Sequence, residues 1–458
     1  MKISTQITAA LVAVGIVSQA MATDPVVYLT GSSAYRSTVF SALSDNSGTS
    51  NSVFQTGTIT YGTWGNATAG SAGYMVFHGT LTNGQAVYIN CAWSGSEAGI
   101  ASACNTTLLN TRRDNTTTPL AGSPETWVDA ATATLSGAGN VQSGNPGPNG
   151  SPANGAQLEA SSRQADLAQA DTSQAVSWTP ATNNTPTALK DYGSEGVCTF
   201  TISRNVNPNP SQDWLDCTNV TMAQLNIILA NGYAPAWFIS GNPNDLMNCY
   251  IVGRNLGSGT RMNILSCSTY GGRSAVKQNS IGYGVDNRDP SQSVTTLLLQ
   301  NEGNNGYESG GGVAKALANT GGSSSSGSCQ QLDPVHNTGT NWFAIGYLSP
   351  SDALSTGNNG GQTPPLFANT NNWVTLDGVT QNNNNIENGS YWFWGHEHLY
   401  GKNQISGIQD TVGGVVFKAV QSKLLSLNLG VAAGGHDAAI PYDLMFVSKS
   451  SDVAFPSY

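Results

Sequence analysis

Short apolar runs alternate along the chain with stretches whose apolar residues recur every three or four positions. Residues 26–29 and 87–92 are apolar runs that predict buried strands. Each is followed by a Ser- and Gly-rich turn and then by a helical pattern, at 34–43 and 97–103. Strands that alternate with helices in this way are typical of an α/β fold with mostly parallel sheets.

The same order of strand, turn and helix occurs around Arg254. Residues 250–252 predict a buried strand and 260–265 the start of a helix, with Gly257, Ser258 and Gly259 between them. A helix start has unpaired backbone N–H groups and the positive end of a dipole, so it favours anions. Arg254 adds a planar, permanently charged donor suited to phosphate-like oxygens. The tract therefore predicts an anion site, although a Gly-Ser turn beside a surface arginine would have the same sequence.

Other segments complete the predicted framework. Thr221 and Gln224 form a capping box that opens a helix over 222–231, and Gly232 ends it. Residues 44–86 and 105–160 are rich in Asn, Gly, Ser and Thr and predict loop or hairpin insertions. Further strands are expected at 200–203, 342–347, 373–376 and 444–448, further helices at 312–318 and 410–427, and a linker at 321–328.

Residues 165–174 predict a third passage from strand to turn, with Asp171 at its tip. In parallel sheets, ligands bind beyond the carboxyl ends of the strands. The turns at 31–35, 94–97, 170–173 and 254–260 all follow predicted strands, so we expect them to converge on one site.

Residues 1–22 have the features of a secretory signal, with Lys2, an apolar core and a small-residue cleavage site at Ala20-Met21-Ala22. No stretch reaches the length of a transmembrane helix. We therefore expect an exported protein of the periplasm, the medium or the cell surface that does not span a membrane.

The formal net charge of −10 argues against nucleic acid or an anionic membrane as a partner. It does not exclude a small anion, which a local group of dipoles can bind.

In an oxidising compartment the seven cysteines favour disulfides. Pairing of neighbours would join Cys91 to Cys104, Cys198 to Cys217 and Cys249 to Cys267 and leave Cys329 single, but the sequence cannot establish the pairing. The sequence has no CxxC pair, so we do not expect a structural zinc site.

Six segments carry a resemblance to a known family by their sequence and their order along the chain, namely TGSSAY (30–35), WSGSEAGI (93–100), ADLAQADTSQ (165–174), NVTMAQLNIILANG (219–232), VGRNLGSGTR (252–261) and WFAIGYLSPSDAL (342–354). In these segments the chain resembles the PstS-like periplasmic phosphate-binding proteins of ABC transporters. The resemblance implies a two-lobed type II periplasmic-binding fold, with the ligand in the cleft between the lobes. It implies lobe 1 at 23–195 plus about 366–458 and lobe 2 at 196–365.

Carried over residue by residue, the resemblance implies a ligand site with donors from both lobes. Asp171 matches the carboxylate that faces the anion and selects a protonated one. Where the family has a threonine in the first turn this chain has Ala34, and Glu97 and Ala98 replace a Ser-Gly pair. The full set implied is Ser32, Ser33, Ala34, Tyr35, Ser96, Asp171, Arg254, Ser258, Gly259 and Thr260.

The expected function is therefore capture of phosphate or a related oxyanion for uptake, by a monomer that hands it to an ABC transporter permease. No cofactor, metal or catalysis is expected. A surface or structural protein that keeps the fold without the ligand is one alternative, and a secreted phosphatase is a second.

The sequence offers two further groups of candidate residues. His396 and His398 share a strand face and would be candidates for a metal, but no third ligand has suitable spacing. Ser33, Ser94 or Ser96 with His436 would be candidates for a hydrolase, but the sequence around them is not Gly-x-Ser-x-Gly. The aromatic residues 391–394 are most simply core, and Glu97 is explained by the helix dipole.

Overall fold

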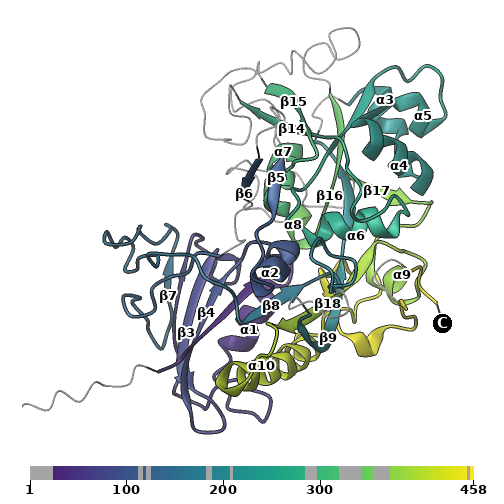
Figure 1. Cartoon of the computed structure of the whole chain (residues 1–458). Helices are drawn as coiled ribbons and strands as arrows, with labels where there is room; N and C mark the ends of the chain where they lie inside the picture. Colours follow the sequence, from purple (N-terminus) through teal and green to yellow (C-terminus); the bar gives the residue numbers. More distant parts are fainter. Residues whose placement is uncertain are drawn as a thin grey trace, which may run out of the picture.

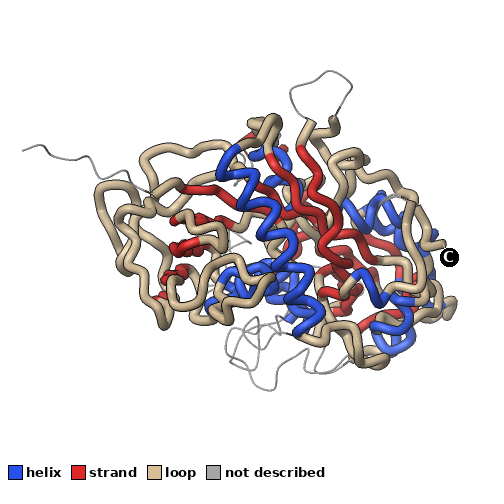
Figure 2. Tube along the Cα trace, turned by 90° about the horizontal axis from the view of Figure 1, so that it is seen from below, coloured by secondary structure: helices blue, strands red, loops and turns tan. Residues whose placement is uncertain are grey.

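The computed structural model describes residues 24–111, 117–119, 125–181, 188–206, 210–283, 297–318, 342–354, 372–450 and 454–457. The predicted signal at 1–22, the linker at 321–328 and Cys329 lie outside these ranges. Two mixed sheets dominate the described part, with helices and long loops around them (Figures 1 and 2). The expectation of two α/β units is confirmed, whereas the expectation of mostly parallel sheets is wrong, because antiparallel hairpins extend both.

The first sheet has nine strands in the order β19-β9-β18-β8-β1-β4-β3-β2-β7. Its centre is parallel, since β1 pairs in parallel with both β4 and β8. The strands are β1 (Val26–Gly31), β2 (Thr60–Trp64), β3 (Tyr74–Thr80), β4 (Ala86–Ala92), β7 (Asn140–Gln142), β8 (Leu167–Ala170), β9 (Lys190–Thr199), β18 (Trp394–Gly401) and β19 (Ala439–Ile440). The predicted insertion at 44–86 thus supplies two strands of the sheet.

The second sheet has eight strands, with parallel β13 and β16 at its centre. The strands are β10 (Thr201–Arg204), β11 (Asn219–Val220), β12 (Tyr233–Pro235), β13 (Asn248–Val252), β14 (Gln278–Tyr283), β15 (Leu297–Gly303), β16 (Phe343–Leu348) and β17 (Trp373–Leu376). A separate short hairpin joins β5 (Leu109–Thr111) to β6 (Thr117–Pro119).

Most predicted helices are present within a few residues of their expected bounds. The capping box of Thr221 and Gln224 forms, and Gly232 ends the helix with a φ of 86°. The predicted strand at 444–448 is wrong: the chain there leaves a short 3-10 helix (Tyr442–Leu444). The helices are α1 (Arg36–Leu43), α2 (Ser96–Ala103), α3 (Gln212–Asp216), α4 (Met222–Asn231), α5 (Ala236–Ser240), α6 (Gly259–Cys267), α7 (Gly310–Ala318), α8 (Pro350–Leu354), α9 (Asn383–Glu387) and α10 (Gly407–Ser426).

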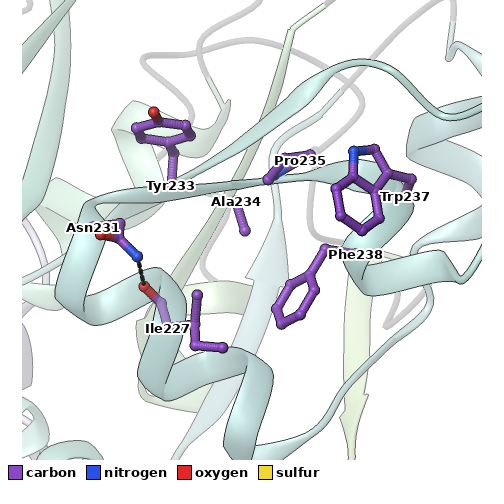
Figure 3. Close-up of a pocket in the computed structure, with 7 residues that line it drawn as sticks. All are labelled: Ile227, Asn231, Tyr233, Ala234, Pro235, Trp237 and Phe238. Atoms are coloured by element: carbon purple, nitrogen blue, oxygen red, sulfur yellow. Dashed lines mark hydrogen bonds between the residues drawn. The ribbon is translucent and has the colours of Figure 1, made fainter. Parts of the chain in front are cut away.

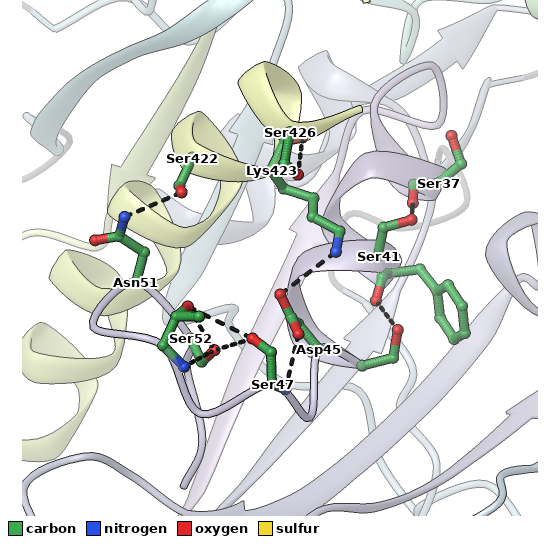
Figure 4. A network of polar contacts seen from close by, with 12 residues as sticks. Ser37, Ser41, Asp45, Ser47, Asn51, Ser52, Ser422, Lys423 and Ser426 are labelled. Carbon is green, nitrogen blue, oxygen red and sulfur yellow. Dashed lines mark hydrogen bonds and ion pairs between the residues drawn. The ribbon is translucent and has the colours of Figure 1, made fainter. Parts of the chain in front are cut away.

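The long helix α10 packs on α1 and on β9 of the first sheet. Polar contacts tie it to the loop after α1: Lys423 pairs with Asp45 at 3.4 Å, and Asn51 Nδ2 donates to Ser422 Oγ at 3.1 Å (Figure 4). These contacts are partly exposed, so packing rather than charge holds the helix in place.

The two sheets are joined by a very short connection. Strand β9 ends at Thr199 and β10 begins at Thr201, so Phe200 alone lies between them. Its ring packs against that of Phe393 with 5.0 Å between the centroids. Tyr391, Trp392, Phe393 and Trp394 are all buried, which confirms the prediction that these aromatic residues form core.

Candidate functional site

The turn between β13 and α6 carries the arginine and the small residues singled out in the sequence. Ser258 caps α6 by accepting a hydrogen bond from Arg261 N at 3.2 Å. Gly259 and Thr260 are the first residues of this helix, where backbone N–H groups lack intrahelical acceptors. The described turn is buried, so its dipole acts in a medium of low dielectric constant.

Arg254 is buried, with 3% of its surface exposed. Its backbone N donates to the Tyr347 hydroxyl at 3.1 Å, and Nη2 donates to the Glu308 carbonyl at 3.0 Å. Burial lowers the pKa of the guanidinium, and the carboxyls of Asp352 and Asp171 act in the opposite direction. A buried arginine stays charged in proteins, so Arg254 brings a full positive charge to this turn.

Arg261 has a supporting role. Its Nη1 donates to the carbonyls of Arg254 at 3.2 Å and of Asn304 at 2.7 Å. These bonds fix the backbone on which the Arg254 side chain stands.

The turns of the first sheet meet this turn directly. Glu97 N, in the first turn of α2, donates to the Gly257 carbonyl at 3.0 Å. A Cβ on Gly259 would lie 1.4 Å from Asp171 Oδ1 and 2.8 Å from Ser96 Cβ. Glycine is therefore the residue that lets the two sides come this close.

Asp171 follows β8 and is almost completely buried. Its backbone N donates to Ser96 Oγ at 3.3 Å, and its carbonyl accepts from Asn263 Nδ2 of α6 at 2.7 Å. Asp171, Ser96, Gly259 and the start of α6 thus form one contiguous group.

The turn after β1 lies on the same edge of the first sheet. Ser32 is buried and its backbone N donates to the Gln169 carbonyl at 2.9 Å, while Ser33 and Ala34 are half-buried. Tyr35 is fully buried at the start of α1. The Ser32 hydroxyl lies beside Glu397 and acts against the rise in that carboxyl's pKa, without a hydrogen bond of normal geometry.

Glu97 does more than favour the helix dipole. It is buried and accepts from Thr172 Oγ1 at 2.7 Å and from Trp178 N at 2.8 Å. Burial raises its pKa to about 7, although both hydrogen bonds act in the opposite direction. Glu97 therefore holds the segment after Asp171, which the dipole explanation missed.

Sequence reasoning also missed side chains that come from distant segments. Burial lowers the pKa of Arg36, directly after the first turn, and Asp352 acts on it in the opposite direction, as it does on Arg254. The position of Arg36 after the Ser-Ser-Ala-Tyr turn was the available signal. Cys198 and Glu397 also lie close to Asp171, and nothing local in the sequence marks them.

The histidines of the alternative metal and hydrolase sites make structural contacts. The rings of His396 and His398 are 6.1 Å apart, and His396 also packs on Trp394 and Tyr442. His398 Nδ1 lies 3.4 Å from Asp191. His436 pairs with Gln381 at 2.9 Å and packs on Trp373, so its described partners do not include the serines of the hydrolase alternative.

The disulfides expected between neighbouring cysteines do not form among the described residues. The six described cysteines are all buried and none of them is in a disulfide, namely Cys91, Cys104, Cys198, Cys217, Cys249 and Cys267. The proposed neighbour pairs are wrong because these residues pack as small apolar side chains within separate strands and helix ends.

A surface hollow of about 280 Å³ lies elsewhere, between α4, β12 and α5 (Figure 3). Its walls are mostly apolar and aromatic, including Tyr233, Trp237 and Phe238. None of its lining residues belongs to the turns described above.

None of the described helices combines the length and the apolar character that a membrane span requires.

No family model and no curated protein matches this chain. Among solved structures, it is similar to a phosphate ABC transporter substrate-binding protein of Clostridium perfringens with bound phosphate, at a TM-score of 0.41 and 13% identity, over 91% of this chain and 99% of the other. It is also similar to an ABC-type phosphate transport receptor of Vibrio cholerae (TM-score 0.37, 11% identity, 88% and 98% covered). A third is PstS of Borrelia burgdorferi (TM-score 0.32, 10% identity, 87% and 97% covered). Each of these three is a protein of the class that the sequence resembles.

Proposed function

We propose that this chain is an exported binding protein that captures phosphate or a related oxyanion between its two sheets and performs no chemistry on it. One observation carries the proposal. The charged, buried Arg254 and the start of α6 lie on one side, and Gly259 brings them against Asp171 and Ser96 on the other. An anion between them would meet a guanidinium, a helix N-terminus and hydroxyl donors.

Each group has a distinct role in this proposal. Arg254 supplies charge, and Ser258, Gly259 and Thr260 supply donors at the start of α6. Ser96, Ser32, Ser33 and the backbone of Ala34 and Tyr35 complete the set on the other side. Delivery to a transporter permease, and the two lobes at 23–195 plus about 366–458 and at 196–365, belong to the same proposal.

Asp171 would make the proposed site select between anions. A carboxylate beside an oxyanion is repulsive unless the anion carries a proton that it donates. Phosphate carries such a proton at neutral pH, whereas sulfate does not. We therefore expect binding of phosphate and rejection of sulfate.

Calorimetry on the purified, phosphate-stripped protein tests this function. Titration with phosphate should give one site, and titration with sulfate should give none. Arg254→Ala should weaken phosphate binding by about 100-fold or more, since each hydrogen bond to a charged group contributes about 1.5–3 kcal/mol.

Arg163→Ala is the matched control. Arg163 is half-exposed, pairs with Glu159 at 2.9 Å and stacks on Tyr28, and it belongs to none of the turns that carry Arg254, Ser96 and Asp171. It should keep the affinity of the unmodified protein. A folded protein that binds neither anion, or an Arg254→Ala variant with unchanged affinity, would contradict the proposal. The first result would favour a surface protein without the ligand.

A further inference from the structure

A second group of polar side chains lies in the first sheet on the other side of Asp171. Glu397 on β18 and Cys198 on β9 are on the same face of two paired strands, because Cys198 is opposite Gly395 and side chains alternate. A carboxylate oxygen of Asp171, one of Glu397 and the Cys198 sulfur all lie within 4.8 Å of one another. All three side chains are buried.

The charged groups that act on Glu397 and Cys198 are themselves acidic, whereas Asp171 also faces Arg254. Burial, and then Asp171 and Glu195, raise the pKa of Glu397. Burial, and then Asp171, Glu397 and Asp352, raise the pKa of the Cys198 thiol. Buried anions cost several kcal/mol each without a compensating positive charge. Glu397 and Cys198 must therefore be protonated or share a cation.

Protonation alone leaves hydrogen-bonding capacity unused. Among the described residues, neither oxygen of Glu397 has a hydrogen-bond partner of normal geometry. The Tyr35 hydroxyl also lacks one. That hydroxyl lies 2.3 Å from where a Cβ on Gly196 would be, and Gly196 is directly opposite Glu397 in the sheet. A protonated Glu397 would have the Ser32 hydroxyl beside it as one acceptor for its O–H, whereas a cation would use the whole carboxylate together with nearby oxygens.

We propose that Asp171, Cys198 and Glu397 bind a divalent cation of borderline softness, such as Zn²⁺. A thiolate with two carboxylates suits such an ion better than Ca²⁺ or Mg²⁺, which prefer oxygen ligands alone. Ligand atoms around tetrahedral zinc are roughly 3.5 Å apart, so modest side-chain movement completes the site. On binding, the thiol loses its proton to solvent. The proposal is separate from anion capture, although Asp171 belongs to both.

Metal analysis of the purified protein tests this site. After incubation with Zn²⁺ and removal of the excess, the protein should retain one equivalent. Cys198→Ser and Glu397→Gln should each reduce retention at least tenfold. Cys91→Ser is the matched control, since Cys91 is also a fully buried thiol on a strand of the first sheet, and it should retain the metal.

Two measurements on the unmodified protein keep the test valid if a variant fails to fold. Co²⁺ in place of Zn²⁺ should give the absorption band of a cobalt thiolate. Bound Zn²⁺ should also protect Cys198, located by peptide mass spectrometry, from alkylation under mild denaturation, while Cys91 stays unprotected. No retained metal, equal retention in all variants, or no protection of Cys198 would overturn the proposal. Phosphate calorimetry in the presence of a chelator tests anion capture independently.

Discussion

The two sides of the candidate site differ in how the chain builds them. The side on the second sheet is basic, and its parts come from one continuous tract between Val252 and Arg261. The side on the first sheet is acidic and gathers Asp171, Cys198 and Glu397 from three separate strands or strand ends. The first could be inferred from neighbouring residues, whereas the second exists only after the sheet has formed.

This difference has an electrostatic consequence. Arg254 is a permanent charge, whereas the acidic side is made of groups whose charge depends on protons or on a bound cation. Changes on the basic side should therefore act on anion affinity at every pH. Substitutions on the acidic side should have effects that depend on the pH or on whether a metal ion is bound.

The largest expected effect comes from the contact between the two sides. Gly259→Ala places a methyl group 1.4 Å from Asp171 Oδ1, so the two turns must separate. Overpacking of this kind costs about 3 kcal/mol. If that cost falls on the closed arrangement, the apparent affinity for phosphate should drop about 100-fold, which calorimetry measures.

Gly414→Ala is the control for this substitution. Gly414 lies in α10, and a Cβ there would meet nothing within 4 Å. Alanine should leave the affinity unchanged and stabilise the helix by up to about 1 kcal/mol. Equal affinities in both variants would mean that the turns do not need to approach each other for binding.

A smaller effect, which depends on pH, is expected at Glu97. Its pKa is about 7 in the folded protein against an ordinary 4.5, mainly because of burial. The folded state therefore holds a proton that the unfolded state has lost, and stability decreases as the pH rises from about 4.5 through 7. The loss is about 3 kcal/mol.

Glu97→Gln removes this titration. Between pH 5 and pH 8, the variant should gain up to about 3 kcal/mol of stability relative to the unmodified protein. Urea unfolding at both pH values gives the difference. Asp171 and Arg273, which face Glu97, remain in both proteins. Parallel pH profiles would show that Glu97 ionises in the folded state as it does in the unfolded one.

The smallest effect is expected far from both sides, at the contact between α10 and the loop after α1. Lys423→Met removes the 3.4 Å pair with Asp45, in which both side chains are partly exposed. Such pairs contribute less than about 1 kcal/mol. Thermal unfolding should show a small change that decreases with added salt, and phosphate affinity should stay constant. A larger loss would mean that the pair anchors α10.

Local chemistry made much of the framework predictable. The capping box at Thr221, the glycine that ends α4 and the strand before Arg254 act over a few residues, and each is found where the pattern indicated. Sheet composition was not predictable in the same way. Strand β9 and the β14–β15 hairpin were missed, and the strand order depends on pairing between distant segments.

The candidate site also combines residues that local patterns predict with residues that only distant strand pairing brings together. Asp171 and Ser96 lie together because turns after parallel strands of one sheet share an edge. Gly259 comes from the second sheet and meets them where the two sheets touch, which its sequence alone does not predict. In the sequence, Glu397 stands out only as the residue between two histidines, and Cys198 only as one partner of a predicted disulfide that does not form. Their closeness depends on the register of β18 against β9, which no local pattern encodes.

The place of β18 in the first sheet also bears on the order in which the protein folds. Strands β8 and β9 do not pair with each other in this sheet, because β18 lies between them. The second sheet, from β10 to β17, is complete in the sequence before β18 begins. During synthesis the first sheet therefore stays in two parts until residue 401 is available. Anything that binds the unfinished chain meets the exposed edges of β8 and β9.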